Sequence, residues 1–121
     1  MKPAKADISN RGPVWRTLSN LFLDTNLEQV DLEYIALGLA ASPYTIEEIE
    51  GILFDEVYPI CIWNLRAVAG NWAGFDGDAL QEAILRRLDR PLKIPRYLHV
   101  GHWMIRDDWK KVKKIIHELR R

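Results

Sequence analysis

The chain has 121 residues, which is enough for one domain and too few for two ordinary ones. Hydrophobic residues make up 48% of it and charged residues 28%, a composition typical of a soluble globular protein with one core. Lys and Arg together number 17, as do Asp and Glu. This balance argues against direct binding to nucleic acid, because nucleic-acid binders usually carry an excess of basic residues.

The sequence also argues against insertion into a membrane and against secretion. The longest apolar run, residues 57–63, is seven residues long and contains a proline, whereas a membrane-spanning helix needs roughly 20 residues. The N-terminal segment has no apolar stretch of the kind that a secretory signal carries. The single cysteine, Cys61, cannot form a disulfide within the chain. We therefore expect a cytoplasmic protein.

In chain order, the first two helices are predicted from the positions of prolines and capping residues. Residues 1–10 have the character of a loose polar leader. Pro13 suits the first position of a helix, and residues 14–23 carry apolar side chains at the spacing of a buried helix face. Asp31 suits the N-cap of a second helix, which is expected to end before Pro43.

The third helix has the most specific start signal in the chain. The Thr-Ile-Glu-Glu sequence that begins at Thr45 predicts a capping box, in which the Thr45 hydroxyl accepts a hydrogen bond from the backbone N–H of Glu48 and the Glu48 carboxylate reaches back. Tyr44 before the cap and Ile49 after it are placed to form a hydrophobic staple. We expect this helix to cover residues 46–56.

Three further helices are predicted in the second half of the chain. Pro59 is expected to open a fourth helix over residues 59–68. For each of the last two helices, two aspartates are candidate caps: Asp76 or Asp78 for the fifth, and Asp107 or Asp108 for the sixth. Between these helices, residues 91–98 contain two prolines, so this segment is expected to be extended, as a short strand or a crossover.

The predicted fold is all-α, a compact bundle of five or six short helices that forms a single domain over residues 11–121. No segment shows the sustained period-two alternation that a half-buried strand requires. The residues expected at the centre of the core are Phe22, Ile35, Leu53, Trp63, Ile84 and Trp109. The apolar face of the last helix is expected to include Val112, Ile115, Ile116 and Leu119 as well.

Charge is segregated along the chain. Residues 17–65 contain nine acidic residues and no Lys or Arg, whereas residues 86–121 contain twelve basic and four acidic residues. Either the two halves pack together and neutralise each other, or an acidic face binds a basic partner. Acidic residues at helix N-termini are explained by the helix dipole, but Glu50, Asp55 and Glu56 lie later in the third helix. The basic residues of the last helix are explained as a solvated face, with phosphate binding as the alternative.

Three patterns resemble catalytic or metal sites, and each is incomplete. His99 and His102 have a spacing compatible with a shared metal ion, but a zinc site needs three or four protein ligands. The segment from Asp76 begins like a calcium loop, yet Arg87 stands where the closing glutamate belongs. Cys61 has isoleucine on both sides, which favours a buried and inert thiol. We therefore expect no enzymatic activity, no metal and no cofactor.

Three segments together resemble an uncharacterised family of small bacterial proteins. Residues 18–25 read LSNLFLDT, residues 41–45 and 55–59 read ASPYT and DEVYP, and residues 69–76 read AGNWAGFD. The resemblance extends over residues 13–88 and implies no catalytic residue. In its small, single-domain, cysteine-poor character the chain is similar to immunity proteins, which neutralise toxin domains delivered by neighbouring bacteria, as in contact-dependent inhibition. Immunity proteins against nuclease toxins are commonly acidic on the binding face.

These features predict a binding protein rather than an enzyme. The first hypothesis is an immunity protein that occludes a basic toxin domain, such as a nuclease, through an acidic face. The alternative is a helical adaptor or regulatory domain that binds an endogenous protein. The predicted partner-binding residues are Glu47, Glu50, Asp55 and Glu56, together with Trp72 as an aromatic anchor. Reversal of Glu47, Glu50 and Glu56 to lysine is expected to leave the fold intact, because these positions are predicted to lie off the apolar face.

Overall fold

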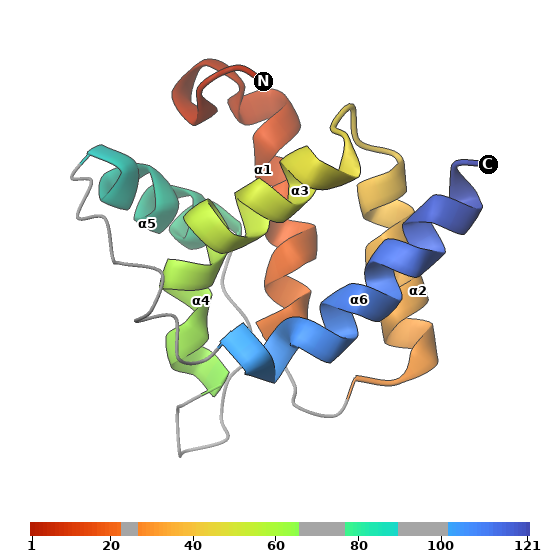
Figure 1. The fold of residues 1–121 in the computed structure, drawn as a ribbon. Helices are drawn as coiled ribbons and strands as arrows, with labels where there is room; N and C mark the ends of the chain where they lie inside the picture. Colours follow the sequence, from red (N-terminus) through yellow and green to blue (C-terminus); the bar gives the residue numbers. More distant parts are fainter. Residues whose placement is uncertain (23–26, 66–76, 90–101) are drawn as a thin grey trace.

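The computed structural model describes residues 1–22, 27–65, 77–89 and 102–121 (Figure 1). These ranges contain helices and short connections and no strand, so the predicted all-α class is confirmed. The α-helices are α1 (Ile8–Ser19), α2 (Gln29–Ala40), α3 (Ile46–Ile52), α4 (Tyr58–Leu65), α5 (Gly77–Asp89) and α6 (His102–Leu119). Among the described residues, no helix combines the length and the apolar character that crossing a membrane requires. The predicted extended segment at 91–98 lies outside the described residues.

The core forms where α1, α2, α6 and the middle of the chain meet. α1 runs through the centre of the molecule and packs against α2 and α5, while α2 packs most extensively against α6 (Figure 1). Five residues predicted for the core are at most 2% exposed: Phe22, Ile35, Leu53, Ile84 and Trp109. The side chain of Trp63 lies outside the described residues. Leu119, predicted to point inward, is 48% exposed, because it lies in the last turn of α6, two residues before the C-terminus.

The chain is helical closer to its N-terminus than predicted. α1 begins at Ile8 rather than at Pro13, so the predicted loose leader is too long by several residues. The reason is Asp7, which is buried and accepts hydrogen bonds from the Tyr44 hydroxyl and from Asn10 Nδ2, the latter at 3.0 Å. The hydrogen bonds from Tyr44 and Asn10 lower the pKa of the Asp7 carboxyl group. These contacts fix the first turn of α1 against the loop before α3.

Two helices begin upstream of their predicted caps. α2 has Glu28 as its N-cap, and Asp31 lies three residues later, where its Oδ2 accepts a hydrogen bond from the Glu28 backbone N–H at 3.0 Å. α6 is already helical before Asp107 and Asp108, because Ile105 lies in the core and extends its apolar face. The predicted caps of α2 and α6 are therefore wrong.

The third and fourth predicted helices form one continuous helical segment over residues 46–65. α3 passes into a π-helix, Leu53–Val57, which passes directly into α4. The predicted capping box at the start of α3 is confirmed. Thr45 Oγ1 accepts from the Glu48 backbone N–H at 3.1 Å, and Glu48 Oε1 accepts from the Thr45 backbone N–H at 2.9 Å.

Pro59 lies inside this continuous segment instead of opening a helix. Its missing N–H leaves the Asp55 carbonyl oxygen without an intrahelical α-type donor, and Arg87 Nη1 on α5 donates to that oxygen at 3.3 Å. The backbone N–H of Tyr58 bonds to the Leu53 carbonyl, five residues back, as in a π-helix. The π-helix and Arg87 together accommodate the proline, so the helix continues through it.

Candidate functional site

The four carboxylates predicted to form one binding ridge have different environments. Glu47 and Asp55 are exposed. The side chain of Glu50 is 43% exposed and that of Glu56 only 12% exposed. The structure therefore leaves Glu47 and Asp55 fully available to a partner and places Glu56 on the inner side of the helix.

Glu56 is the acceptor at the centre of a buried polar cluster. Its carboxylate pairs with Arg11, with 2.6 Å between Arg11 Nη1 and Glu56 Oε2, and it accepts a hydrogen bond from Trp15 Nε1 at 2.8 Å. The Arg11 side chain is 1% exposed, donates to the Lys2 carbonyl and lies 5.6 Å from the centroid of the Tyr44 ring. The prediction that Glu56 faces a partner is wrong, because this carboxylate holds α1 against the middle of the chain.

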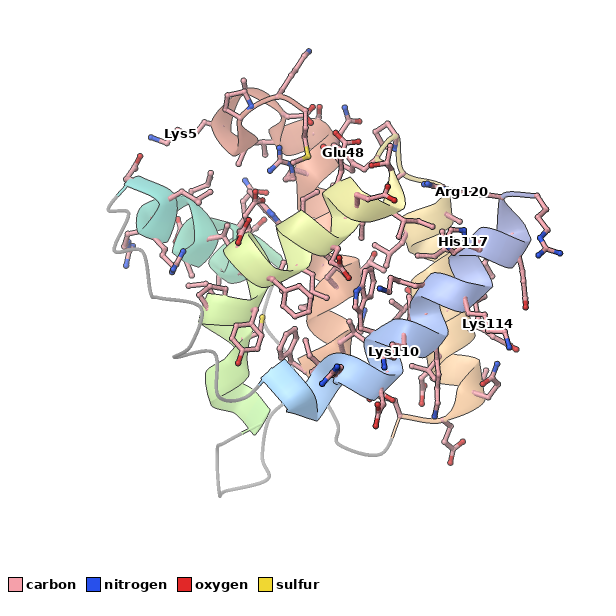
Figure 2. All side chains as sticks on the ribbon, viewed as in Figure 1. Lys5, Glu48, Lys110, Lys114, His117 and Arg120 are labelled. Carbon is pink, nitrogen blue, oxygen red and sulfur yellow. The ribbon has the colours of Figure 1, made fainter. Side chains whose placement is uncertain are left out.

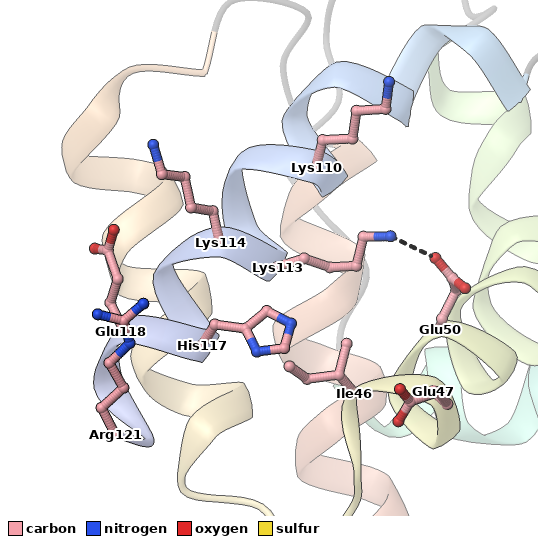
Figure 3. A pocket seen from close by; sticks show the side chains of 9 residues that line it. All are labelled: Ile46, Glu47, Glu50, Lys110, Lys113, Lys114, His117, Glu118 and Arg121. Carbon is pink, nitrogen blue, oxygen red and sulfur yellow. Dashed lines mark hydrogen bonds and ion pairs between the residues drawn. The ribbon is translucent and has the colours of Figure 1, made fainter.

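Glu50 joins α3 to α6. Its Oε1 accepts a hydrogen bond from Trp109 Nε1 at 2.8 Å. The same oxygen pairs with Lys113 Nζ at 3.1 Å (Figure 3). The Lys113 ammonium also lies 6.0 Å from the centroid of the Trp109 ring. The acidic middle of the chain and the basic C-terminal helix thus neutralise each other in part, as one of the two interpretations of the charge pattern expects.

An open cleft of about 450 Å³ lies between α3 and α6 (Figure 3). Ile46, Glu47 and Glu50 line it from α3. The remaining lining residues come from α6 and the C-terminus: Lys110, Lys113, Lys114, His117, Glu118 and Arg121. The two walls therefore differ in charge, with carboxylates on α3 and mainly basic groups on α6.

Most basic groups of the cleft have no partner within the part of the chain that the structure describes. Only Lys113 forms an ion pair there, whereas Lys110, Lys114, His117 and Arg121 form none. Figure 2 shows Lys110, Lys114 and His117 following one another along α6. Like charges held close together raise the local positive potential, so this wall attracts anionic groups.

From the sequence, the basic residues of α6 are interpreted as a solvated face. Their place in a cleft is the part of the candidate site that the sequence analysis missed. The signal was nevertheless present, because positions 110, 114, 117 and 121 follow one another at intervals of four, three and four residues and share one helix face, and position 113 is three residues from 110 and four from 117. What the sequence cannot supply is the opposite wall. That wall comes from α3, more than fifty residues earlier in the chain.

A family model described as a domain of unknown function, DUF7079, matches residues 9–115 of the chain. The chain belongs to this family. The match extends beyond residue 88, where the resemblance read from the sequence ends, and it includes α3 and most of α6. No similar protein was found among curated proteins or among solved structures. Membership of an uncharacterised family is thus confirmed, and His117 and Arg121 of the cleft lie beyond the match.

The other candidate sites of this DUF7079 chain are described only in part. Trp72, His99 and the start of the incomplete calcium loop at Asp76 lie outside the described residues, as does the side chain of His102. Within the described ranges, no group of three His, Cys, Asp or Glu side chains is placed to hold a metal ion. Cys61 is buried as predicted, and burial raises the pKa of its thiol to about 12, so the thiol is protonated and unreactive at neutral pH.

Proposed function

We propose that this DUF7079 protein works by binding another protein at the α3–α6 cleft, and that it is an immunity protein that neutralises a bacterial toxin domain. The observation that supports this proposal is the charge arrangement of the cleft. The exposed carboxylate of Glu47 lies on one wall, and the basic groups that have no ion-pair partner among the described residues lie on the other. Occlusion of a toxin needs such a complementary surface and a fast encounter, and it needs no catalytic group.

The charge expected of the partner follows from which groups are free. Glu56 is engaged inside the molecule and Glu50 is paired with Lys113, so the carboxylates left for a partner are Glu47 and Asp55. α6 offers cations on the wall of the cleft opposite Glu47. We therefore propose a partner that presents carboxylates toward α6 and basic groups toward α3, in place of a uniformly basic one. Opposite charges at fixed positions also reject proteins with the wrong pattern, which gives selectivity.

The cleft walls are held in place before any partner arrives. The hydrogen bond from Trp109 to Glu50 and the ion pair of Glu50 with Lys113 fix α6 against α3. The capping box at Thr45 fixes the start of α3. A preorganised surface loses less conformational entropy on binding than a mobile one, which favours tight association. This is the property that a protein acting purely by occlusion requires.

Co-expression with the neighbouring toxin tests the proposal. If the reading frame directly upstream encodes a large secreted protein, its C-terminal domain is expressed in cells with and without this chain. We expect the wild-type protein to keep the cells alive and the Lys110→Glu/Lys114→Glu variant to protect them poorly, because two cations of the cleft are reversed.

The matched control is Arg106→Glu/Lys111→Glu, which changes two exposed cations of the same helix that do not line the cleft. This control is expected to protect as well as the wild type. Equal cell death with and without the wild-type chain would contradict the immunity function and leave binding of an endogenous protein as the alternative. Equal protection by both double variants would place the interface outside the cleft.

A further inference from the structure

α2 has apolar side chains on both of its faces. The inner face is buried against α1 and α6 and consists of Leu32, Ile35, Ala36 and Leu39. On the opposite face Val30, Tyr34 and Leu37 are 65%, 70% and 61% exposed. A helix at the surface of a globular protein normally presents polar side chains on the face away from the core, so this outer row is a candidate contact surface.

The spacing of the outer row fits another helix. Val30, Tyr34, Leu37 and the exposed Ala41 are separated by four, three and four residues. Intervals of four and three residues are the spacing of the side chains along the seam between two paired helices, where each side chain fits between those of the facing helix. α2 therefore carries a second packing stripe beyond the one that the fold uses, and we call Val30, Tyr34, Leu37 and Ala41 the outer stripe.

We propose that a second copy of this chain covers the outer stripe, with the two α2 helices antiparallel about a two-fold axis. An axis between Tyr34 and Leu37 places Tyr34 opposite the second copy's Leu37, and Val30 opposite the second copy's Ala41. Both pairs join a larger side chain to a smaller one, which lets the two stripes interdigitate. Because a two-fold interface uses the same patch on both copies, the outer stripe supplies both sides of the contact.

Charge favours the antiparallel arrangement. The first half of α2 carries the exposed Asp31 and Glu33. Arg120 is held at the other end of α2, where its guanidinium donates to the carbonyls of Leu39 and Ala40, both at 3.3 Å. Antiparallel pairing brings the acidic end of one α2 toward Arg120 of the other copy and places the two helix dipoles in opposite directions, which is favourable. Parallel pairing brings like charges together. The chain has no net charge, so two copies do not repel each other as a whole.

The expected dimer is weak and leaves the cleft open. α2 has 12 residues and is about 18 Å long at 1.5 Å per residue. A stable interface buries about 800 Å² on each partner, more than a single row of three large side chains supplies. We therefore expect dissociation in the micromolar range. No residue of α2 lines the cleft, so self-association is separate from the function proposed above.

Sedimentation equilibrium of the purified full chain tests the proposal without any partner. The wild type is expected to change from monomer to dimer as its concentration rises through the micromolar range. Tyr34→Glu/Leu37→Glu is expected to weaken self-association by a factor of about ten or more, because it places charges in the apolar stripe. Lys111→Glu is the control, since it changes the net charge by the same amount at an exposed position of α6. A wild type that stays monomeric throughout, or a double variant that dimerises equally well, would overturn the proposal.

Disulfide formation tests the orientation. We expect a mixture of Val30→Cys and Ala41→Cys variants to form a disulfide between the two different chains, because the antiparallel register places these positions opposite each other. Cys61 is buried and does not compete for the new thiols. Disulfides formed only between two copies of the same variant would overturn the antiparallel register. Dimerisation of the wild type with the expected mixed disulfide would support the proposal even if the co-expression experiment fails.

Discussion

Replacement of Glu56 by lysine is expected to lower the free energy of unfolding by about 3–5 kcal/mol, the usual cost of leaving one partner of a buried ion pair without the other. The Glu56 carboxylate neutralises Arg11, whose side chain is 1% exposed, and it accepts the indole N–H of Trp15. A lysine at this position would face the buried guanidinium with a like charge. Small domains are stable by only about 5–15 kcal/mol, so a large share of the stability would be lost.

The neighbouring residue provides a matched control. Asp55→Lys makes the same change of charge one position earlier, on an exposed side chain, and is expected to alter the free energy of unfolding by no more than about 0.5 kcal/mol. Urea denaturation followed by circular dichroism measures both variants. Equal effects of Asp55→Lys and Glu56→Lys would contradict the buried cluster. Reversal of Glu56 is therefore expected to destabilise the fold, contrary to the prediction from the sequence, because its carboxylate is paired with the buried Arg11.

Truncation of Trp109 is expected to have an effect of similar size. Trp109 is 2% exposed, and it belongs to the core and donates a hydrogen bond to Glu50 of the cleft. Trp109→Ala should cost about 3–5 kcal/mol, because it removes buried apolar area and leaves a cavity. Trp109→Phe keeps most of the ring and loses the hydrogen bond to Glu50, for which we expect a cost of about 1–2 kcal/mol.

The comparison of the two Trp109 variants separates packing from hydrogen bonding. Both are measured by urea denaturation at the same neutral pH. If Trp109→Ala costs no more than Trp109→Phe, the indole does not fill the space between α6 and the core, and the proposed rigid wall of the cleft loses its support. A larger cost for the alanine variant agrees with the structure.

Local signals in the sequence were sufficient for the fold class and for much of the core. The capping box at Thr45 depends on two residues three positions apart, and both of its hydrogen bonds form as predicted. The buried positions Ile35, Ile84 and Trp109 follow from helical spacing alone. Such features need no knowledge of the rest of the chain, because the groups involved belong to the same helix.

Glu56 is expected from the sequence on the exposed binding face, although the sequence contains a signal for a buried position. It stands seven residues after Ile49, on the same helix face as Ile49, Ile52 and Leu53, so a carboxylate there is directed toward the core. A carboxylate in that position requires a buried cation. Its partner, Arg11, lies 45 residues away and could not be identified from local spacing.

The remaining differences also depend on partners that are distant in the sequence. Pro59 predicts a helix start, but the helix passes through it with the help of the π-helix before it and of Arg87 on α5, which donates to the Asp55 carbonyl. Likewise, Glu50 is 63 residues from Lys113, so the pairing that forms the cleft is a property of the tertiary structure. The segregation of charge was visible in the sequence, but which carboxylates are neutralised inside the molecule and which are left exposed was not.

The most direct test of the proposed function is the rate at which the protein associates with a toxin domain against which it protects cells, measured by stopped-flow mixing at several salt concentrations. Oppositely charged surfaces speed association, and salt weakens this effect. We expect Lys110→Glu/Lys114→Glu to slow association by a factor of about ten and to reduce its dependence on salt, while Arg106→Glu/Lys111→Glu associates like the wild type. The same rate and the same salt dependence for all three proteins would contradict a binding surface at the α3–α6 cleft.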